Sequence, residues 1–166
     1  MFFLHTLSHL FPVIIVYLLV MLQPKRLPYR KYQKQKGSFE KIATTGELFF
    51  GTFGIQALSP CKLPASSLEA ARRVLTRTLK RQGKIYIKVF PDLVVSKKPQ
   101  EVRMGKGKGN PHQYVARVRK GEVIFELSHV PKAVAQEACN QLSERFCVPL
   151  RFIDRSQTVK EWGTEN

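Results

Sequence analysis

Residues 66–90, SSLEAARRVLTRTLKRQGKIYIKVF, contain the two patterns that decide the fold. In residues 67–82, apolar side chains recur every three or four positions, which is typical of an amphipathic helix with one buried face. Ser66 followed by Glu69 predicts a capping box at the start of this helix. Gly83 stands where a glycine commonly ends a helix. The stretch therefore predicts a helix that stops just before an extended segment.

That extended segment, residues 84–90, alternates strictly between two kinds of side chain, which predicts a strand with one buried face. Ile85, Ile87 and Val89 are expected on one side, and Tyr86, Lys88 and Phe90 on the other.

The remaining elements are predicted from shorter patterns. Residues 48–58 are expected to form a strand, in which Gly51 and Gly54 indicate a bulge or the close approach of another backbone. The other expected elements are strands at 113–119 and 122–128 joined as a hairpin about Lys120-Gly121, a second helix from Pro131 to about Arg145, and a last strand at 148–153. The order of elements predicts an α+β fold, with two helices on one face of a mostly antiparallel sheet.

Charge is strong and unevenly distributed. The chain of 166 residues has a formal net charge of +16. Residues 1–111 hold 20 Lys/Arg against 5 Asp/Glu, whereas residues 112–166 hold 8 against 7. An evenly solvated surface would mix the signs throughout, so the asymmetry favours a polyanion partner, either a phosphate backbone or, second, an anionic membrane surface.

The sequence suggests four regions: an apolar extension (1–22), a basic RNA-binding tail (23–47), an α+β RNA-binding domain (48–153) and a polar tail (154–166). The apolar extension fits neither a cleaved signal peptide nor a transit peptide. It is expected to be a membrane anchor, a segment packed against a partner protein, or a translated extension before an older start at Met21. The last two are favoured over the anchor.

The cations of the tail and of the first helix are expected to contact RNA. The tail has poor periodicity and is expected to become ordered on a polyanion. The helical cations meet only one acid, Glu69, so they would repel one another without an anion nearby. The residues concerned are Lys25, Arg26, Arg30, Lys31, Lys34 and Lys36 in the tail, and Arg72, Arg73, Arg77, Lys80, Arg81, Lys84 and Lys88 in and after the helix.

Between Phe90 and Gln113 lie 22 residues with little helix or strand pattern, and such a long loop in a compact domain is usually functional or disordered. Its glycines allow a ligand to approach the backbone closely, and its cations suit phosphates. A nucleotide-binding loop is excluded because no Ser or Thr follows a lysine, and no helix follows the glycines. The tip consists of Arg103, Met104, Gly105, Lys106, Gly107, Lys108, Gly109 and Asn110.

The sequence gives no support for a zinc site, a disulfide framework or a catalytic site. Cys61, Cys139 and Cys147 contain no Cys-x-x-Cys pair, so neither a zinc site nor a disulfide framework is expected. No catalytic constellation is present, and Asp92 and Glu101 are too isolated to form an acid–base pair. The sequence therefore predicts a protein without enzyme activity, metal or cofactor.

Several stretches resemble one family, the bacterial-type large-subunit ribosomal protein L-sixteen, over about residues 21–153. The matching stretches, in the order and spacing of the family, are Met21–Arg26, Gly51–Gly54, Glu69–Arg73, Gly83–Asp92 and Arg103–Asn110. The resemblance implies an α/β-hammerhead-like domain that binds large-subunit rRNA near the peptidyl-transferase centre, beside neighbouring ribosomal proteins. It also implies support for aminoacyl-tRNA in the A site and for late subunit assembly, with the tip of the loop close to that tRNA.

The sequence departs from the family in its Lys/Gln-rich residues 31–45, in a second helix poorer in alanine, and in residues 1–20 and 154–166, which have no bacterial counterpart. These features suggest a mitochondrial ribosome and an organelle-encoded chain, with a plastid or the bacterial cytoplasm as alternatives. The competing interpretation is a membrane-tethered binder of nucleic acid or anionic lipid, with residues 1–22 as its anchor.

Overall fold

The computed structural model describes residues 22–33 and 47–156, and this part of the chain forms two antiparallel sheets and two helices. The elements are β1 (Phe53–Ala57), β2 (Cys61–Pro64), α2 (Ala65–Thr78), β3 (Lys84–Ile87), β4 (Leu93–Lys97), β5 (Asn110–Val118), β6 (Val123–Ser128), α3 (Lys132–Ser143) and β7 (Leu150–Asp154). The α+β class predicted from the sequence is confirmed. Residues 1–21 of the apolar extension, residues 34–46 and residues 157–166 of the polar tail lie outside the described residues.

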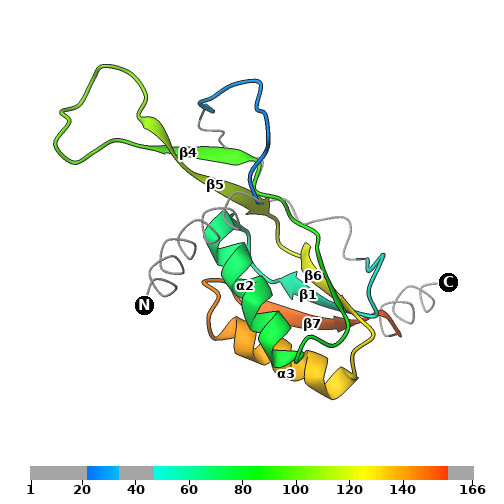
Figure 1. Cartoon of the computed structure of the whole chain (residues 1–166). Coiled ribbons are helices and arrows are strands. Elements are labelled where there is room, and N and C mark those ends of the chain that lie inside the picture. The colour runs from blue at the N-terminus through cyan, green and yellow to red at the C-terminus, as the bar shows by residue number, and fades with distance from the viewer. Residues whose placement is uncertain (1–21, 34–46, 157–166) are drawn as a thin grey trace, which may run out of the picture.

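The larger sheet has the strand order β3-β6-β1-β7, and α2 and α3 pack together over one of its faces (Figure 1). The smaller sheet has the order β2-β5-β4. Figure 1 shows β4 and β5 extending away from the helices as an arm, with the N-terminal segment 22–33 beside it. The end of β5 joins the core through Ala116 and Val118, and the rest of the arm projects from it.

The core lies between the larger sheet and the helices. Side chains alternate along β1 and β6, so that Ile55, Phe125 and Leu127 are fully buried on the helical side. They pack in one cluster with Leu68 and Leu75 of α2. The alternation predicted for residues 84–90 is confirmed, because Ile85, Ile87 and Val89 join this cluster.

A buried carboxylate organises the opposite face of the larger sheet. Glu126 of β6 is fully buried, and its carboxylate accepts backbone N–H groups of Phe49 (3.3 Å), Phe50 (2.7 Å) and Gly51 (2.8 Å). Lys88 Nζ lies 3.4 Å from the same carboxylate. Burial alone would raise the pKa of Glu126, but the three N–H donors and Lys88 outweigh it and hold that pKa below its usual range.

The segment that carries these donors lies flat against the sheet. A Cβ on Gly51 would come within 2.6 Å of the Leu127 carbonyl oxygen, so this position requires glycine. The close backbone approach predicted for Gly51 is therefore confirmed. At Gly54 the neighbour is a side chain instead, because Leu48 Cδ2 lies 2.4 Å from where a Cβ would be.

The hairpin predicted from residues 113–119 and 122–128 is wrong. β5 pairs with β2 and β4, whereas β6 pairs with β1 and β3 in the other sheet. The turn between them bonds to the end of β1 instead of closing a hairpin. Gly121 N donates to Ala57 O (2.8 Å), and Ala57 N donates to Glu122 O (3.0 Å). These two bonds direct the chain from β5 in the smaller sheet to β6 in the larger sheet.

The predicted capping box is also wrong. The helix α2 begins at Ala65 directly after Pro64, and no side chain caps it. Ser66 lies inside the helix, and the carboxylate of Glu69 bonds to arginine side chains of α2. Proline at the residue before the first turn is compatible with such a start, because those first N–H groups lack intrahelical partners.

The helix ends four residues earlier than predicted, at Thr78, and Gly83 has another role. Lys80 (φ 49°) and Arg81 (φ 64°) adopt left-handed backbone conformations that end the helical path. Gly83 (φ 73°) lies where a Cβ would come within 2.4 Å of the Ser128 carbonyl oxygen. This glycine allows β3 to start against β6.

Replacing Glu126 with Gln should destabilise the protein by about 2–4 kcal/mol at pH 7, because an amide cannot accept three N–H donors and leaves Lys88 without its counter-charge. Urea unfolding of the full chain measures the change. Glu101→Gln, at an exposed position on the arm, is the matched control and should leave the midpoint unchanged. Equal stability of the Glu126→Gln variant and the wild type would contradict the organising role of this carboxylate.

Stability should fall as the solution is acidified. Three carboxyls, those of Glu69, Glu126 and Asp154, have pKa values below their usual range in the folded state. A lowered folded pKa contributes stability above the unfolded value, here 4.5 for Glu126, that is lost as pH falls through the folded value. Urea midpoints measured from pH 7 to pH 3 should therefore drop below about pH 4.5, and drop less steeply in Glu126→Gln. Parallel curves for the two proteins would exclude Glu126 as a contributor.

Candidate nucleic-acid interface

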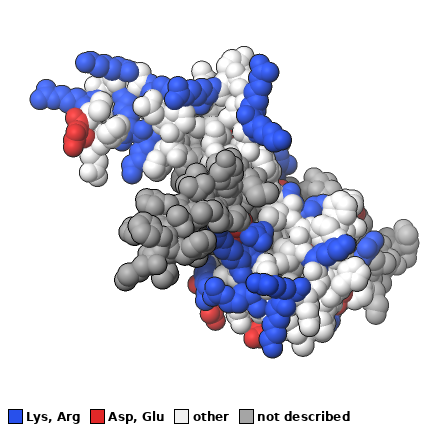
Figure 2. All heavy atoms as spheres, viewed as in Figure 1, with Lys and Arg blue, Asp and Glu red and all other residues white. Residues whose placement is uncertain are grey.

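Basic side chains gather over two parts of the surface. Figure 2 shows Lys and Arg over the arm and the adjacent N-terminal segment, and a second group over the helical part of the molecule. The N-terminal segment and the arm carry Lys25, Arg26, Arg30, Lys31, Lys97, Lys98, Arg103, Lys106 and Lys108, and α2 with the turn and strand after it carries Arg72, Arg73, Arg77, Lys80, Arg81 and Lys84.

The arm shortens the loop that the sequence predicts. β4 pairs with β5 along its whole length, for example Val94 opposite Tyr114, so the long structureless segment expected between Phe90 and Gln113 is wrong. Only residues 98–109 connect the two strands. The β-branched pair within Leu93–Val95 was the feature from which β4 could have been predicted.

The tip of the arm is open to solvent. Residues 101–108 are all exposed, and Met104 keeps 97% of its accessible surface. Gly105 (φ 100°) and Gly107 (φ 81°) have positive φ, as does Lys106 between them (φ 52°). No heavy atom would lie within 4 Å of a Cβ at either glycine. The glycines therefore serve the backbone conformation and leave space for a ligand to approach.

The N-terminal segment is tied to this tip by two lysines. Lys31 Nζ donates to the Lys108 carbonyl oxygen at 2.8 Å, and Lys108 Nζ donates to the Tyr32 carbonyl oxygen. The tail and the loop, 77 residues apart in sequence, thus form one surface. Lys25, Arg26, Arg30 and Lys31 are exposed on it, whereas Lys34 and Lys36 lie outside the described residues.

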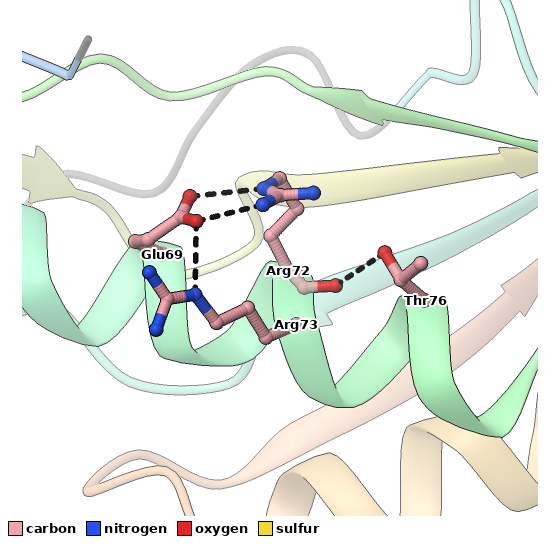
Figure 3. A network of polar contacts seen from close by, with 4 residues as sticks. All are labelled: Glu69, Arg72, Arg73 and Thr76. Atoms are coloured by element: carbon pink, nitrogen blue, oxygen red, sulfur yellow. Dashed lines mark hydrogen bonds and ion pairs between the residues drawn. The ribbon is translucent and has the colours of Figure 1, made fainter. Parts of the chain in front are cut away.

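On α2, two arginines are held by one buried acid (Figure 3). Arg72 meets the Glu69 carboxylate with two bonds, Nε at 2.9 Å and an Nη at 2.7 Å, and Arg73 Nε adds a third at 3.2 Å. Hydrogen bonding from Arg72 is the main cause that lowers the pKa of Glu69. The repulsion expected among the helical cations is therefore relieved in part within the protein, and both guanidiniums are fixed at the surface.

The other predicted cations are not all alike. Arg77 is exposed in the last turn of α2, Lys80 and Arg81 follow it in the turn, and Lys84 is exposed at the start of β3. Lys80, Arg81 and Lys84 lie outside the helix, because α2 ends at Thr78.

Lys88 belongs to the fold more than to this surface. Its Nζ lies beside the Glu126 carboxylate, 4.5 Å from the ring centre of Phe49 and 5.0 Å from that of Phe50. Phe50 in turn stacks on Tyr86, with ring centres 5.4 Å apart. The charge of Lys88 is thus matched by a buried acid.

Sequence reasoning missed three residues that the arm adds. Lys97 ends β4 and Lys98 begins the loop, where its Nζ donates to the Gly105 carbonyl oxygen. Tyr114 of β5 is half-buried beside the N-terminal segment. The adjacent lysines next to the glycine-rich tip were a visible pattern, but the place of Tyr114 depended on the pairing of β4 with β5.

The described part of the chain gives little support for a metal site, a reactive thiol or a membrane-spanning helix. No group of three His, Cys, Asp or Glu side chains there could hold a metal ion. Burial is the main cause that raises the pKa of Cys61 to about 11 and that of Cys139 to about 11, which keeps both thiols protonated. Within residues 22–33 and 47–156, no helix is long and apolar enough to cross a bilayer.

Comparison with known proteins identifies the family to which the chain belongs. Residues 24–153 match the sequence model of the family described as ribosomal protein L16p/L10e. Proteins named large ribosomal subunit protein uL16 are similar over most of the chain. The one from Rhodopseudomonas palustris (strain BisB18) is 48% identical over 136 residues, covering 81% of this chain and 98% of the relative.

Two further relatives with the same name show similar values. The protein of Methylocella silvestris is 49% identical over 138 residues, covering 82% of this chain and 99% of the relative. The protein of Rhodospirillum rubrum is 47% identical over 136 residues, covering 81% and 97%. The chain therefore belongs to the ribosomal protein L16p/L10e family, a family of structural and non-enzymatic ribosomal components.

Proposed function

We propose that this protein is a constituent of the large ribosomal subunit that binds large-subunit rRNA with the arm, the N-terminal segment and α2. The observation that carries the proposal is the exposed glycine–lysine tip of the arm. Residues 98–109 contain four cations, Lys98, Arg103, Lys106 and Lys108, against the single acid Glu101. Cations held together on an exposed loop, with open backbone at two glycines, suit a phosphate backbone.

The contacts within the protein favour a joint footprint. The two lysine bonds hold the tail against the tip, so that like charges are kept close together although they repel one another. An RNA backbone lying across both segments would neutralise this charge. Arg72 and Arg73, fixed by Glu69, would provide guanidiniums in a rigid arrangement for further phosphates.

The finer role follows from the family resemblance. We propose that the tip approaches aminoacyl-tRNA in the A site, near the peptidyl-transferase centre, and that the protein contributes to late subunit assembly. Neighbouring ribosomal proteins are the expected partners of its other surfaces. In this function the protein positions RNA and does not act as an enzyme.

For location we propose the mitochondrial ribosome, on the basis of the Lys/Gln-rich tail, with a plastid or the bacterial cytoplasm as alternatives. The relatives described above are bacterial. Mass spectrometry of large subunits from purified organelles and from the cytosol tests the location. Finding the protein only in cytosolic ribosomes would exclude the mitochondrial assignment.

Replacing Lys106 and Lys108 together with Ala should leave the melting temperature of the protein nearly unchanged, because both side chains are exposed and the lost bond from Lys108 to Tyr32 lies outside the core. Large subunits assembled with this variant should bind aminoacyl-tRNA more weakly or mature more slowly, as measured by sucrose gradients and A-site filter binding. The matched control removes two exposed cations from the part of the chain with little net charge, Lys120→Ala with Arg145→Ala. Normal subunits and normal A-site binding with the Lys106/Lys108 variant would refute the role of the tip.

The salt dependence of the affinity for RNA should report how many phosphates the tip contacts. The logarithm of the affinity for large-subunit rRNA should fall linearly with the logarithm of salt concentration. The Lys106/Lys108 variant should show a slope shallower by about 1.5, since each lost phosphate contact removes about 0.7–0.9. An unchanged slope would mean that these lysines do not contact phosphate.

A further inference from the structure

We infer that the groove between the N-terminal segment and the base of the arm binds one unpaired nucleotide of RNA, with its base stacked on Tyr114 and its phosphate held by Lys25 and Arg30. This inference rests on the proposed function, since it names a particular nucleotide site within the RNA-binding surface.

The groove has a volume of about 390 Å³ and is lined by six residues. Four come from the N-terminal segment and two from β5, so the groove exists only while the segment lies along the arm. The lining residues are Pro24, Lys25, Leu27, Arg30, Pro111 and Tyr114.

Two kinds of side chain meet in this groove. Lys25 and Arg30 bring two positive charges, and no Asp or Glu is among the described residues that line it. Leu27, the two prolines and the ring of Tyr114 provide flat or apolar walls. A ligand that matches both must have an anionic end and a planar, weakly polar end, and a nucleotide has both.

The shape favours an unpaired nucleotide over a duplex. A base inside a double helix is stacked on both sides and presents only its edges in the grooves. A splayed base can place a face on an aromatic ring, which is how proteins commonly recognise single-stranded loops and bulges of RNA. A volume of this size accommodates one small ligand.

Both walls are held in place before any ligand arrives. Tyr114 lies opposite Val94 in the β4–β5 ladder, next to the buried Val115, so its backbone is fixed. The opposite wall is anchored by the bonds of Lys31 and Lys108 described above. A groove fixed on both sides loses little conformational entropy on binding.

Fluorescence anisotropy with the full-length protein tests the site. The probes are an octauridylate and the same octamer with its four central bases removed, which have equal phosphate charge. The wild type should bind the complete octamer at least about fivefold more tightly. Tyr114→Phe should keep this preference because the ring remains, and Tyr114→Ala should abolish it. Arg30→Ala should weaken binding of both octamers by a similar factor.

Tyr29→Ala is the matched control, because Tyr29 is 73% exposed beside Arg30 but does not line the groove. It should retain the base preference. A second measurement avoids substitution altogether: ultraviolet crosslinking of 4-thiouridine octamers to the wild type should modify the peptide that contains Tyr114.

Equal binding of the two octamers by the wild type, a preference retained in Tyr114→Ala, or crosslinks confined to other peptides would each overturn the nucleotide site. These outcomes leave the proposed function standing if the protein still binds large-subunit rRNA and sediments with large subunits. Absence from large subunits would be the separate failure of the proposed function.

Discussion

The carboxylate of Glu126 is removed from water in the centre of the larger sheet, and several parts of the fold meet there. A buried carboxylate is costly unless donors and an opposite charge surround it. Phe49, Phe50 and Gly51 supply the donors from the segment before β1, and Lys88 supplies the charge beyond β3. Once these groups are in place, β1 and β3 are fixed on opposite sides of β6. The larger sheet can then present its other face to α2 and α3.

This arrangement separates the part of the chain that gives stability from the part that carries charge. The core is formed by the larger sheet, the helices and some residues of β2 and β5, and its buried residues are apolar apart from Ser128 and three acids. The arm and the N-terminal segment project from it and hold much of the positive charge. Repulsion among those cations therefore acts mainly on exposed segments, where it weakens the core little and remains available to a polyanion.

Much of the fold could be predicted from local patterns, and the failures have a common physical cause. The helical period of Leu68, Leu75 and their neighbours and the alternation in 84–90 report burial directly, and both predictions hold. The pairing of strands, by contrast, depends on contacts between segments that are far apart in the sequence. The turn at Gly121 looks like a hairpin in sequence, yet two bonds to Ala57 direct β6 into another sheet. β2 is four residues long and ends in proline, too short for any period to appear.

The same limit applies to the candidate interface. A sequence counts the cations, but only the structure shows which of them already have an acid. Lys88 is matched by Glu126, and Arg72 and Arg73 share Glu69, whereas the cations of the tail and the tip meet one another through carbonyl oxygens. A carbonyl accepts a hydrogen bond without cancelling the charge of the donor. The tail and the tip therefore keep their positive charge, whereas Glu69 cancels part of the charge of the helical arginines. The glycine-rich tip could be found from sequence because its residues are consecutive. The groove at Tyr114 could not, since its two walls come from segments more than 80 residues apart.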